Sequence, residues 1–168
     1  MGDYTNTLLY AEKLLAKDRG DEDALLGAAE AYFETRSPKA LQTAIKVIHV
    51  LRVKPKPSQV PEEDWTKKRA AYTGSASWIA GAMYIGQNQF VEGERMLRQS
   101  LAALNESDAR VAPVLFYLGW SNYQLANNAE ALRYYKQCST IKSKYQEQAT
   151  KNMDAVASEM RHGQRSNP

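Results

Sequence analysis

Hydrophobic residues recur every three or four positions along most of the chain, which is the spacing of one face of an α-helix. No segment alternates hydrophobic and polar residues in the way that predicts a β-strand. The breaks between periodic segments contain glycine, proline or paired asparagine, which end helices and form turns. We therefore expect an all-α protein. The expected helices are Tyr4–Lys17, Ala24–Glu34, Lys39–Arg52, Pro61–Ile85, Phe90–Leu104, Val111–Leu125, Ala129–Ile141 and a last amphipathic helix that begins near Gln146.

One segment clearly interrupts this pattern. Residues 53–61 read VKPKPSQVP, and their three prolines cannot lie inside a helix. We expect linkers at 18–20 and 53–61 within a single helical domain that covers residues 1–162. Gly74 is a candidate break in the helix that follows the prolines, and Gly163 is a candidate stop for the last helix. Residues 163–168 are then expected to form a disordered tail.

Two stretches of the chain are similar in where they place small residues. The stretch from Ser77, SWIAGAMYIGQNQFVEGERMLRQSL, aligns without gaps with LFYLGWSNYQLANNAEALRYYKQCS from Leu115. The superposed pairs are Gly81 with Gly119, Asn88 with Ala126, Gly93 with Ala131, Leu97 with Tyr135 and Ser100 with Cys138. Helices that cross closely need Gly or Ala where their backbones approach, with larger residues filling the adjacent gaps. Each stretch therefore predicts a tightly crossed helical hairpin.

These hairpins resemble the tetratricopeptide repeat (TPR), a helix–turn–helix unit of about 34 residues. The residues that carry the resemblance are Leu118 and Gly119 for its L-G pair, Gly81 and Tyr84 for G-x-x-Y, and Ala131 and Tyr135 for A-x-x-x-F, with Gly93 at the place of Ala131. A weaker third copy begins at Asp23, with Ala28 or Ala29 in the place of the glycine. The sequence departs from the pattern at Asn122, where the repeat has tyrosine, and at Ser143, where it has proline.

The resemblance implies a right-handed superhelical stack of antiparallel helix hairpins, with about three repeats and a C-terminal capping helix. Ala29 and Gly81 are 52 residues apart, so we expect about 18 extra residues between the first and second repeats, within residues 53–76. The N-terminal helix is similar to the second half of a repeat whose first half is missing.

The first helix of each hairpin lines the concave side of such a stack. One stripe on these helices is rich in aromatic and large apolar side chains. The residues of this stripe that we expect to bind a partner are Trp78, Ile85, Phe116, Trp120 and Tyr123. Aromatic anchors in a groove suit an extended or helical peptide. The alternative is that the stripe is core, packed on the preceding repeat or under the C-terminal helix.

Composition argues against other classes of function. The net charge of +3 is too small to indicate nucleic-acid binding. With one cysteine and two histidines, and without a glycine-rich phosphate-binding motif, we expect no metal, no cofactor and no catalysis. Cys138 occupies a place where the repeat has a small buried residue, so we expect an inert thiol. No apolar run approaches the roughly 18 residues of a membrane-spanning helix, so we expect no membrane insertion.

The favoured interpretation is a soluble interaction module of the TPR type, a scaffold or adaptor that binds a protein or peptide. One alternative is a self-associating domain, a homo-oligomer within a larger assembly that could be associated with the cell envelope. A regulatory subunit or a nonclassical enzyme is less favoured. Residues 1–17 lack a secretory signal, so a complete chain is expected in the cytoplasm, whereas an excised domain would leave the compartment open.

Overall fold

The computed structural model describes residues 3–105 and 107–165. Within them the chain forms eight α-helices and no strand. The helices are α1 (Tyr4–Lys17), α2 (Glu22–Glu34), α3 (Lys39–Val53), α4 (Glu62–Gly86), α5 (Phe90–Ala103), α6 (Val111–Gln124), α7 (Asn128–Ser139) and α8 (Gln146–Arg165). These bounds agree with the expected ones to within two residues. Two expected breaks are wrong, because α4 continues through Gly74 and α8 continues through Gly163. Residues 166–168 of the expected tail lie outside the described residues.

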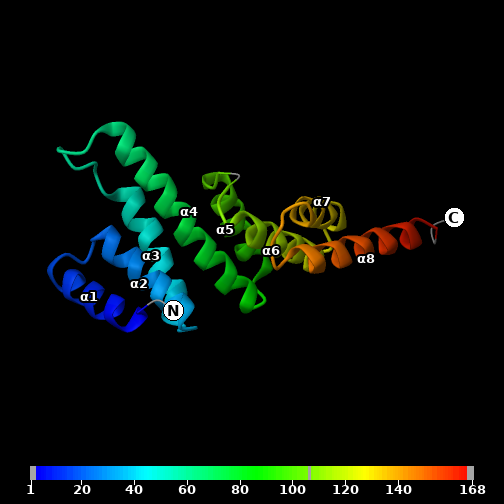
Figure 1. Ribbon diagram of the computed structural model, residues 1–168, viewed down its shortest axis with the longest axis horizontal. Coiled ribbons are helices and arrows are strands. Elements are labelled where there is room, and N and C mark those ends of the chain that lie inside the picture. Colours follow the sequence, from blue (N-terminus) through cyan, green and yellow to red (C-terminus); the bar gives the residue numbers. More distant parts are fainter. Residues whose placement is uncertain (1–2, 106, 166–168) are drawn as a thin grey trace.

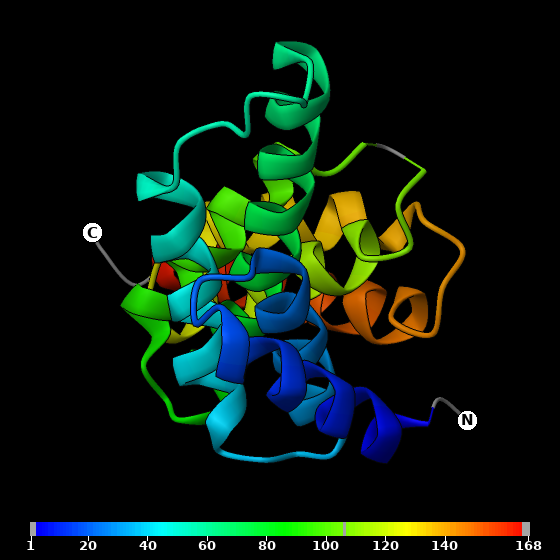
Figure 2. The ribbon, with the colours of Figure 1, turned by 90° about the vertical axis from the view of Figure 1, so that its left-hand side faces the viewer.

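The helices form a helical repeat stack of three antiparallel hairpins, α2–α3, α4–α5 and α6–α7 (Figure 1). Helix α1 packs on α2 before the first hairpin, and α8 packs on α7 after the last. The first helices of successive hairpins also contact one another, α2 with α4 and α4 with α6, and α6 contacts α8. Seen from the α1 end, the first hairpin lies in front of the later helices (Figure 2). The elongated stack therefore has α1 and α8 at opposite ends.

The same turn joins the two helices of every hairpin. Arg36, Asn88 and Ala126 have left-handed backbones, with φ of 56°, 59° and 59°. The residue after each donates a backbone hydrogen bond across the turn, from Ser37 to Tyr32 (2.8 Å), from Gln89 to Tyr84 (2.9 Å) and from Asn127 to Asn122 (2.8 Å). This six-to-one bond is that of a Schellman motif. Arg36 and Asn88 are 52 residues apart, so the residue equivalent to Gly81 is Ala29 rather than Ala28.

The turn at Ala126 yields a stability prediction. Alanine pays a steric cost in the left-handed region that glycine does not, and Ala126 is exposed. Ala126→Gly is therefore expected to raise the free energy of unfolding by about 0.5–1 kcal/mol, measured by urea denaturation. The matched control is Ala71→Gly, an exposed position inside α4, where glycine is expected to lower stability by a similar amount. Changes of the same sign in both variants would contradict this account.

The hairpins cross as closely as their glycines suggest. A Cβ atom added at Gly81 would lie 2.7 Å from Cγ of Leu97, and one added at Gly119 would lie 2.6 Å from Cδ1 of Tyr135. Both partners are buried, at 0% and 2% exposure. The expected close approach at Gly81 and Gly119 is thus confirmed. The remaining repeat positions Gly93, Leu118 and Ala131 are buried, and Tyr84 is half-buried.

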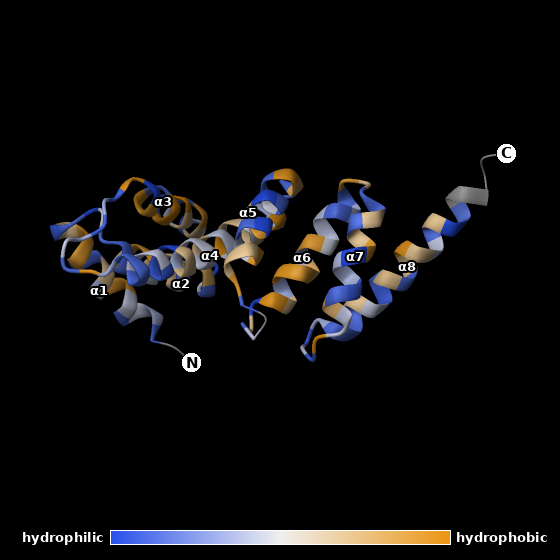
Figure 3. Ribbon diagram, turned by 90° about the horizontal axis from the view of Figure 1, so that it is seen from above, coloured by the Kyte–Doolittle hydropathy of each residue, from blue (hydrophilic) through white to orange (hydrophobic). Residues whose placement is uncertain are grey.

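Helix α8 closes the stack with a single apolar stripe. Ala149 and Val156 are buried against α6 and α7, and Met153 and Met160 pack partly against the same cluster. Exposed polar residues such as Lys151 lie between them, so hydrophobic and hydrophilic residues alternate along this helix (Figure 3). Helix α8 thus covers the last hairpin without presenting a second apolar face.

Helix α4 is the longest, with 25 residues. Gly74 faces Ala103, the last residue of α5, so the first half of α4 extends beyond its partner helix (Figure 1). The expected insertion, residues 53–76, corresponds to the end of α3, the proline-rich loop and this half of α4. Trp65 is the one buried residue in 62–73, at 2% exposure, and most of the other residues of this extension are exposed.

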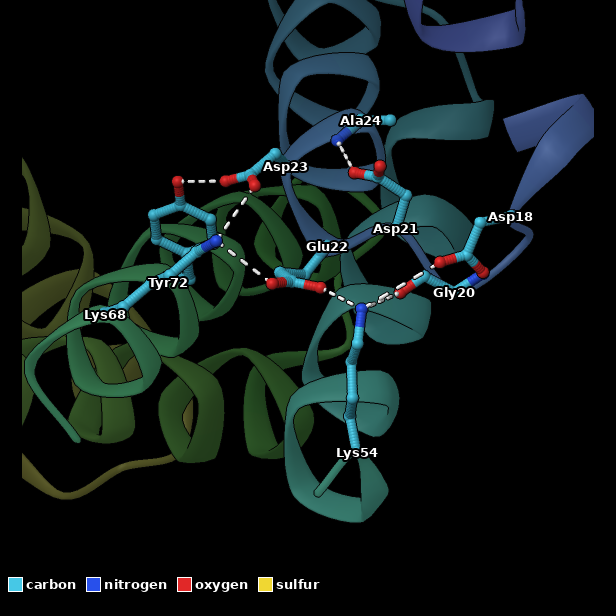
Figure 4. Close-up of polar contacts among 9 residues, drawn as sticks. All are labelled: Asp18, Gly20, Asp21, Glu22, Asp23, Ala24, Lys54, Lys68 and Tyr72. Carbon is cyan, nitrogen blue, oxygen red and sulfur yellow. Dashed lines mark hydrogen bonds and ion pairs between the residues drawn. The ribbon is translucent and has the colours of Figure 1, made fainter. Parts of the chain in front are cut away.

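A polar cluster fastens the extension of α4 to the first hairpin (Figure 4). The buried carboxylate of Glu22 accepts hydrogen bonds from Nζ of Lys54 at 2.5 Å and from Nζ of Lys68 at 3.0 Å. Lys68 also donates to Asp23 at 2.9 Å, and the Tyr72 hydroxyl donates to the same carboxylate at 2.5 Å. These bonds connect the start of α2 with the residue after α3 and with the first half of α4.

Candidate binding cleft

A cleft of about 750 Å³ crosses the first helices of the hairpins. Its walls come from the end of α2, the middle of α4, the start of α6 and the residues that lead into α8. The side chains that line it include Phe33, Glu34, Arg36, Trp78, Arg110, Tyr117, Ser143, Lys144 and Tyr145. The cleft is lined mainly by the first helices of the hairpins, the helices that we expect from the sequence to line a groove.

Four aromatic rings form a continuous row along the cleft. Phe33 belongs to α2, Trp78 to α4 and Tyr117 to α6, and Tyr145 directly precedes α8. Ring centroids are 6.1 Å apart for Phe33 and Trp78, 5.8 Å for Trp78 and Tyr117, and 6.3 Å for Tyr117 and Tyr145. These separations are typical of tilted and edge-to-face aromatic packing. All four side chains are half-buried, so they hold one another in place and still contribute surface to the cleft.

Charged side chains lie around this row. The Arg110 guanidinium pairs with Asp108 at 2.7 Å and donates to the Ser75 hydroxyl, so it is held in place against α4. The hydrogen bonds from Arg110 lower the pKa of the Asp108 carboxyl, which keeps the pair charged. Nζ of Lys144 lies 5.2 Å from the centroid of the Tyr145 ring. Burial raises the pKa of Tyr117, so its hydroxyl stays protonated at neutral pH. The cleft therefore presents a row of aromatic rings with hydrogen-bond donors beside it.

The five residues predicted to bind a partner do not lie in one site in the structure. Trp78 lines the cleft. The Phe116 ring instead packs against Tyr135 and Tyr145, with centroids 5.9 and 5.2 Å apart, as the core alternative proposed. The prediction for Ile85 is wrong, because this side chain is only 1% exposed. A Cβ atom at Gly93 would lie 2.6 Å from Cδ1 of Ile85. The absence of a side chain at Gly93 therefore leaves the space in the α4–α5 interface that Ile85 occupies.

Trp120 and Tyr123 are exposed but belong to a second, smaller pocket. They are 37% and 36% exposed and line a space of about 270 Å³ between the end of α6 and helix α8. The Tyr123 hydroxyl donates to Glu159 of α8 at 3.0 Å. The Trp120 ring also lies 6.1 Å from the ring of Tyr117, which connects the second pocket to the row of aromatic rings.

Three rings of the cleft are absent from the predicted set. Phe33 lies 52 residues before Ile85 and is its equivalent in the first repeat. The sequence leaves the register of that repeat open by one residue, so it does not assign Phe33 to the groove. Tyr117 directly follows Phe116, so a shift of the assumed face by one residue would have found it. Tyr145 recurs in spacing with Ala149 and Met153, which predicts the apolar stripe of a capping helix rather than a groove side chain, and in the structure it lies just before α8.

Other chemical features of the described residues add little to this surface. Burial raises the pKa of the Cys138 thiol to about 11, so the thiol is protonated and unreactive near neutral pH. Over residues 3–105 and 107–165, no group of His, Cys, Asp and Glu side chains is placed to hold a metal ion. None of the helices in this part of the chain is long and apolar enough to cross a membrane.

The fold is similar to that in the crystal structure of MamA, a TPR-containing protein. The superposition has a TM-score of 0.55 at 14% sequence identity and covers 98% of this chain and 92% of that chain. No family model and no curated protein matches the sequence. At this identity the similarity concerns the fold alone. Together with the three equivalent hairpins, it shows that the chain has a TPR-like helical repeat fold.

Proposed function

We propose that this chain is a protein-interaction module that binds a peptide segment of a protein partner in the aromatic cleft. The observation that carries the proposal is the row of four half-buried rings, Phe33, Trp78, Tyr117 and Tyr145, contributed by four different parts of the stack. Aromatic side chains held in place by packing provide large contact areas with little further loss of entropy on binding. Such a row favours a partner with apolar anchor side chains.

The shape and charges of the cleft favour an extended segment. The cleft crosses three hairpins, so it is longer than a single side chain requires, and about 750 Å³ is typical of sites for bound ligands. Arg36 and Lys144 lie at its edges and are exposed, within reach of carbonyl or carboxylate oxygens of a bound segment. The rings would then bind side chains while the edges bind polar groups of the partner.

We propose a role without catalysis. The titratable groups that line the cleft are Glu34, Arg36, Arg110, Lys144 and two tyrosines. Arginine and lysine are protonated at neutral pH and so cannot act as the general base that activates a nucleophile. The Ser143 hydroxyl accepts a hydrogen bond from the backbone N–H of Tyr145 at 3.2 Å, which gives it a structural role at the start of α8. This combination supports recognition rather than group transfer.

The test is to select peptides from a displayed random library on the wild-type protein and to measure their affinities by calorimetry. Tyr117→Ala and Trp78→Ala are each expected to weaken binding about tenfold or more, since the removed rings are central to the row. Tyr117→Phe keeps the ring and is expected to stay within about threefold of the wild type. Selected peptides that bind both alanine variants as tightly as the wild type would contradict the proposal.

A further inference from the structure

Large hydrophobic side chains are exposed at both ends of the stack. Leu9 and Tyr10 on α1 are 52% and 66% exposed, and Trp120 and Tyr123 beside α8 are 37% and 36% exposed. Helices α1 and α8 lie at opposite ends of the molecule (Figure 1). Neighbouring exposed apolar side chains mark these two places as candidate sites for a contact with another protein.

Helix α1 has one covered and one open face. Among the helices of the described chain it contacts α2 only, through a stripe that includes Leu8, Ala11 and Leu14. Leu9 and Tyr10 point away from that contact, as their exposure shows. Lys13 and Lys17 follow Tyr10 by three and seven residues, so they share its side of the helix, and both are exposed. The open face of α1 is therefore an apolar pair beside two cations.

The pocket at the other end suits such a pair. It has a volume of about 270 Å³ and is lined by Trp120, Tyr123 and Gln124 of α6, by Tyr135 of α7, and by α8 residues that include Ala155. An apolar cavity of about 150 Å³ holds a benzene ring, so this pocket has room for one large side chain. None of the described residues that line it is charged, but the Glu159 carboxylate lies beside it and accepts a hydrogen bond from the Tyr123 hydroxyl.

We propose that the open face of α1 in one copy of the chain docks into the α6–α8 pocket of a second copy, with Tyr10 as the anchor. The cations Lys13 and Lys17 on one surface and the Glu159 carboxylate on the other have opposite signs. The two surfaces are different, so one contact leaves a free α1 on one copy and a free pocket on the other. Because α1 and α8 lie at opposite ends of the stack, copies add head to tail, into open chains or, where the rotation closes, into rings.

The strength of this contact follows from its size. One face of a 14-residue helix covers less surface than the roughly 1,200 Å² of a standard stable interface, so we expect a dissociation constant in the micromolar range. The contact uses none of the four rings of the aromatic cleft, although Trp120 of its pocket lies against Tyr117. The proposal does not rest on peptide binding, and self-association is measured without a peptide.

Sedimentation equilibrium of the full chain tests the proposal. From about 5 to about 500 µM, the average mass of the wild type is expected to rise past that of a dimer. Tyr10→Ser and Ala155→Arg are each expected to weaken association at least tenfold. Arginine at exposed position 155 fills the pocket and repels Lys13. Position 155 lies four residues from both Lys151 and Glu159, so the effects of the added charge along the helix offset one another. Circular dichroism checks that both variants stay folded.

Mixing the two variants gives the sharpest result. The Tyr10→Ser variant keeps its pocket and the Ala155→Arg variant keeps its α1 face, so together they form one productive contact. The mixture is expected to reach the mass of a 1:1 dimer and stop there. Val91→Ser, which removes a valine that is 60% exposed on α5, is the control and is expected to associate like the wild type. A wild type that stays monomeric, or a mixture that associates no better than its components, overturns the proposal.

Discussion

Alanine at position 119 is expected to lower the free energy of unfolding by about 2–3 kcal/mol, because the new methyl group overpacks the α6–α7 crossing. Its Cβ would lie 2.6, 2.7 and 3.0 Å from three ring carbons of Tyr135. That ring is 2% exposed and is packed against Phe116, so it cannot turn aside without moving its neighbours. Equilibrium unfolding in urea measures the loss, and a smaller buried surface in the variant would appear as a lower m value.

The matched control for this substitution is Gly86→Ala. Gly86 ends α4, and a Cβ atom added there would have no neighbour within 4 Å in the part of the chain that the structure describes. Alanine at this position is expected to leave stability unchanged or to raise it by up to about 1 kcal/mol, because glycine is the poorer helix former. Equal losses at positions 86 and 119 would show that the contact with Tyr135 does not decide the effect.

The hairpins could be predicted from sequence because their determinants are local. Small residues at Gly81 and Gly119 mark the crossings, and polar turns separate the helices. The first repeat could not be placed to the residue, because Ala28 and Ala29 are both small and both buried in the structure. The left-handed turn at Arg36 decides the register, and arginine does not signal such a turn.

The site could be predicted only in part, because helical spacing does not tell which side chains a neighbouring helix covers. Ile85 and Tyr123 are equivalent in the alignment, yet Ile85 is buried and Tyr123 is exposed. Gly93 leaves space for Ile85 in the second hairpin, whereas Ala131 occupies the equivalent place in the third. Whether the side chain at this position is buried or exposed thus depends on the size of the residue eight positions later, on the second helix of the hairpin.

The polar cluster around Glu22 was beyond sequence reasoning for a different reason. The sequence indicates acidic residues at the start of a helix, where they are usually solvated. The structure brings Lys54 and Lys68 to this carboxylate from 32 and 46 residues away. Only the return of the chain through the proline-rich loop makes these contacts, so no local pattern reports them.

Replacing Glu22 with glutamine is expected to destabilise the protein by about 3 kcal/mol at pH 7. Burial alone would raise the pKa of Glu22, but the hydrogen bonds from Lys54 and Lys68 outweigh it and lower the pKa from 4.5 to about 2. Each pKa unit corresponds to about 1.4 kcal/mol, and removing one member of a buried ion pair leaves the other charges without their partner. Urea unfolding of Glu22→Gln against the wild type measures this loss.

The pH dependence of the same variant identifies the cause. A carboxyl whose pKa is lower in the folded state contributes its full stabilisation above its unfolded value of about 4.5, and loses it as pH falls towards the folded value of about 2. The wild type is therefore expected to lose its advantage over Glu22→Gln between about pH 5 and pH 2. Glu63→Gln is the control, because Glu63 and Lys67 form an exposed pair with side chains 77% and 69% accessible, which contributes about 0.5 kcal/mol or less. If Glu22→Gln and the wild type differ by the same amount at pH 7 and pH 2, the stabilisation comes from packing rather than from the charge of Glu22.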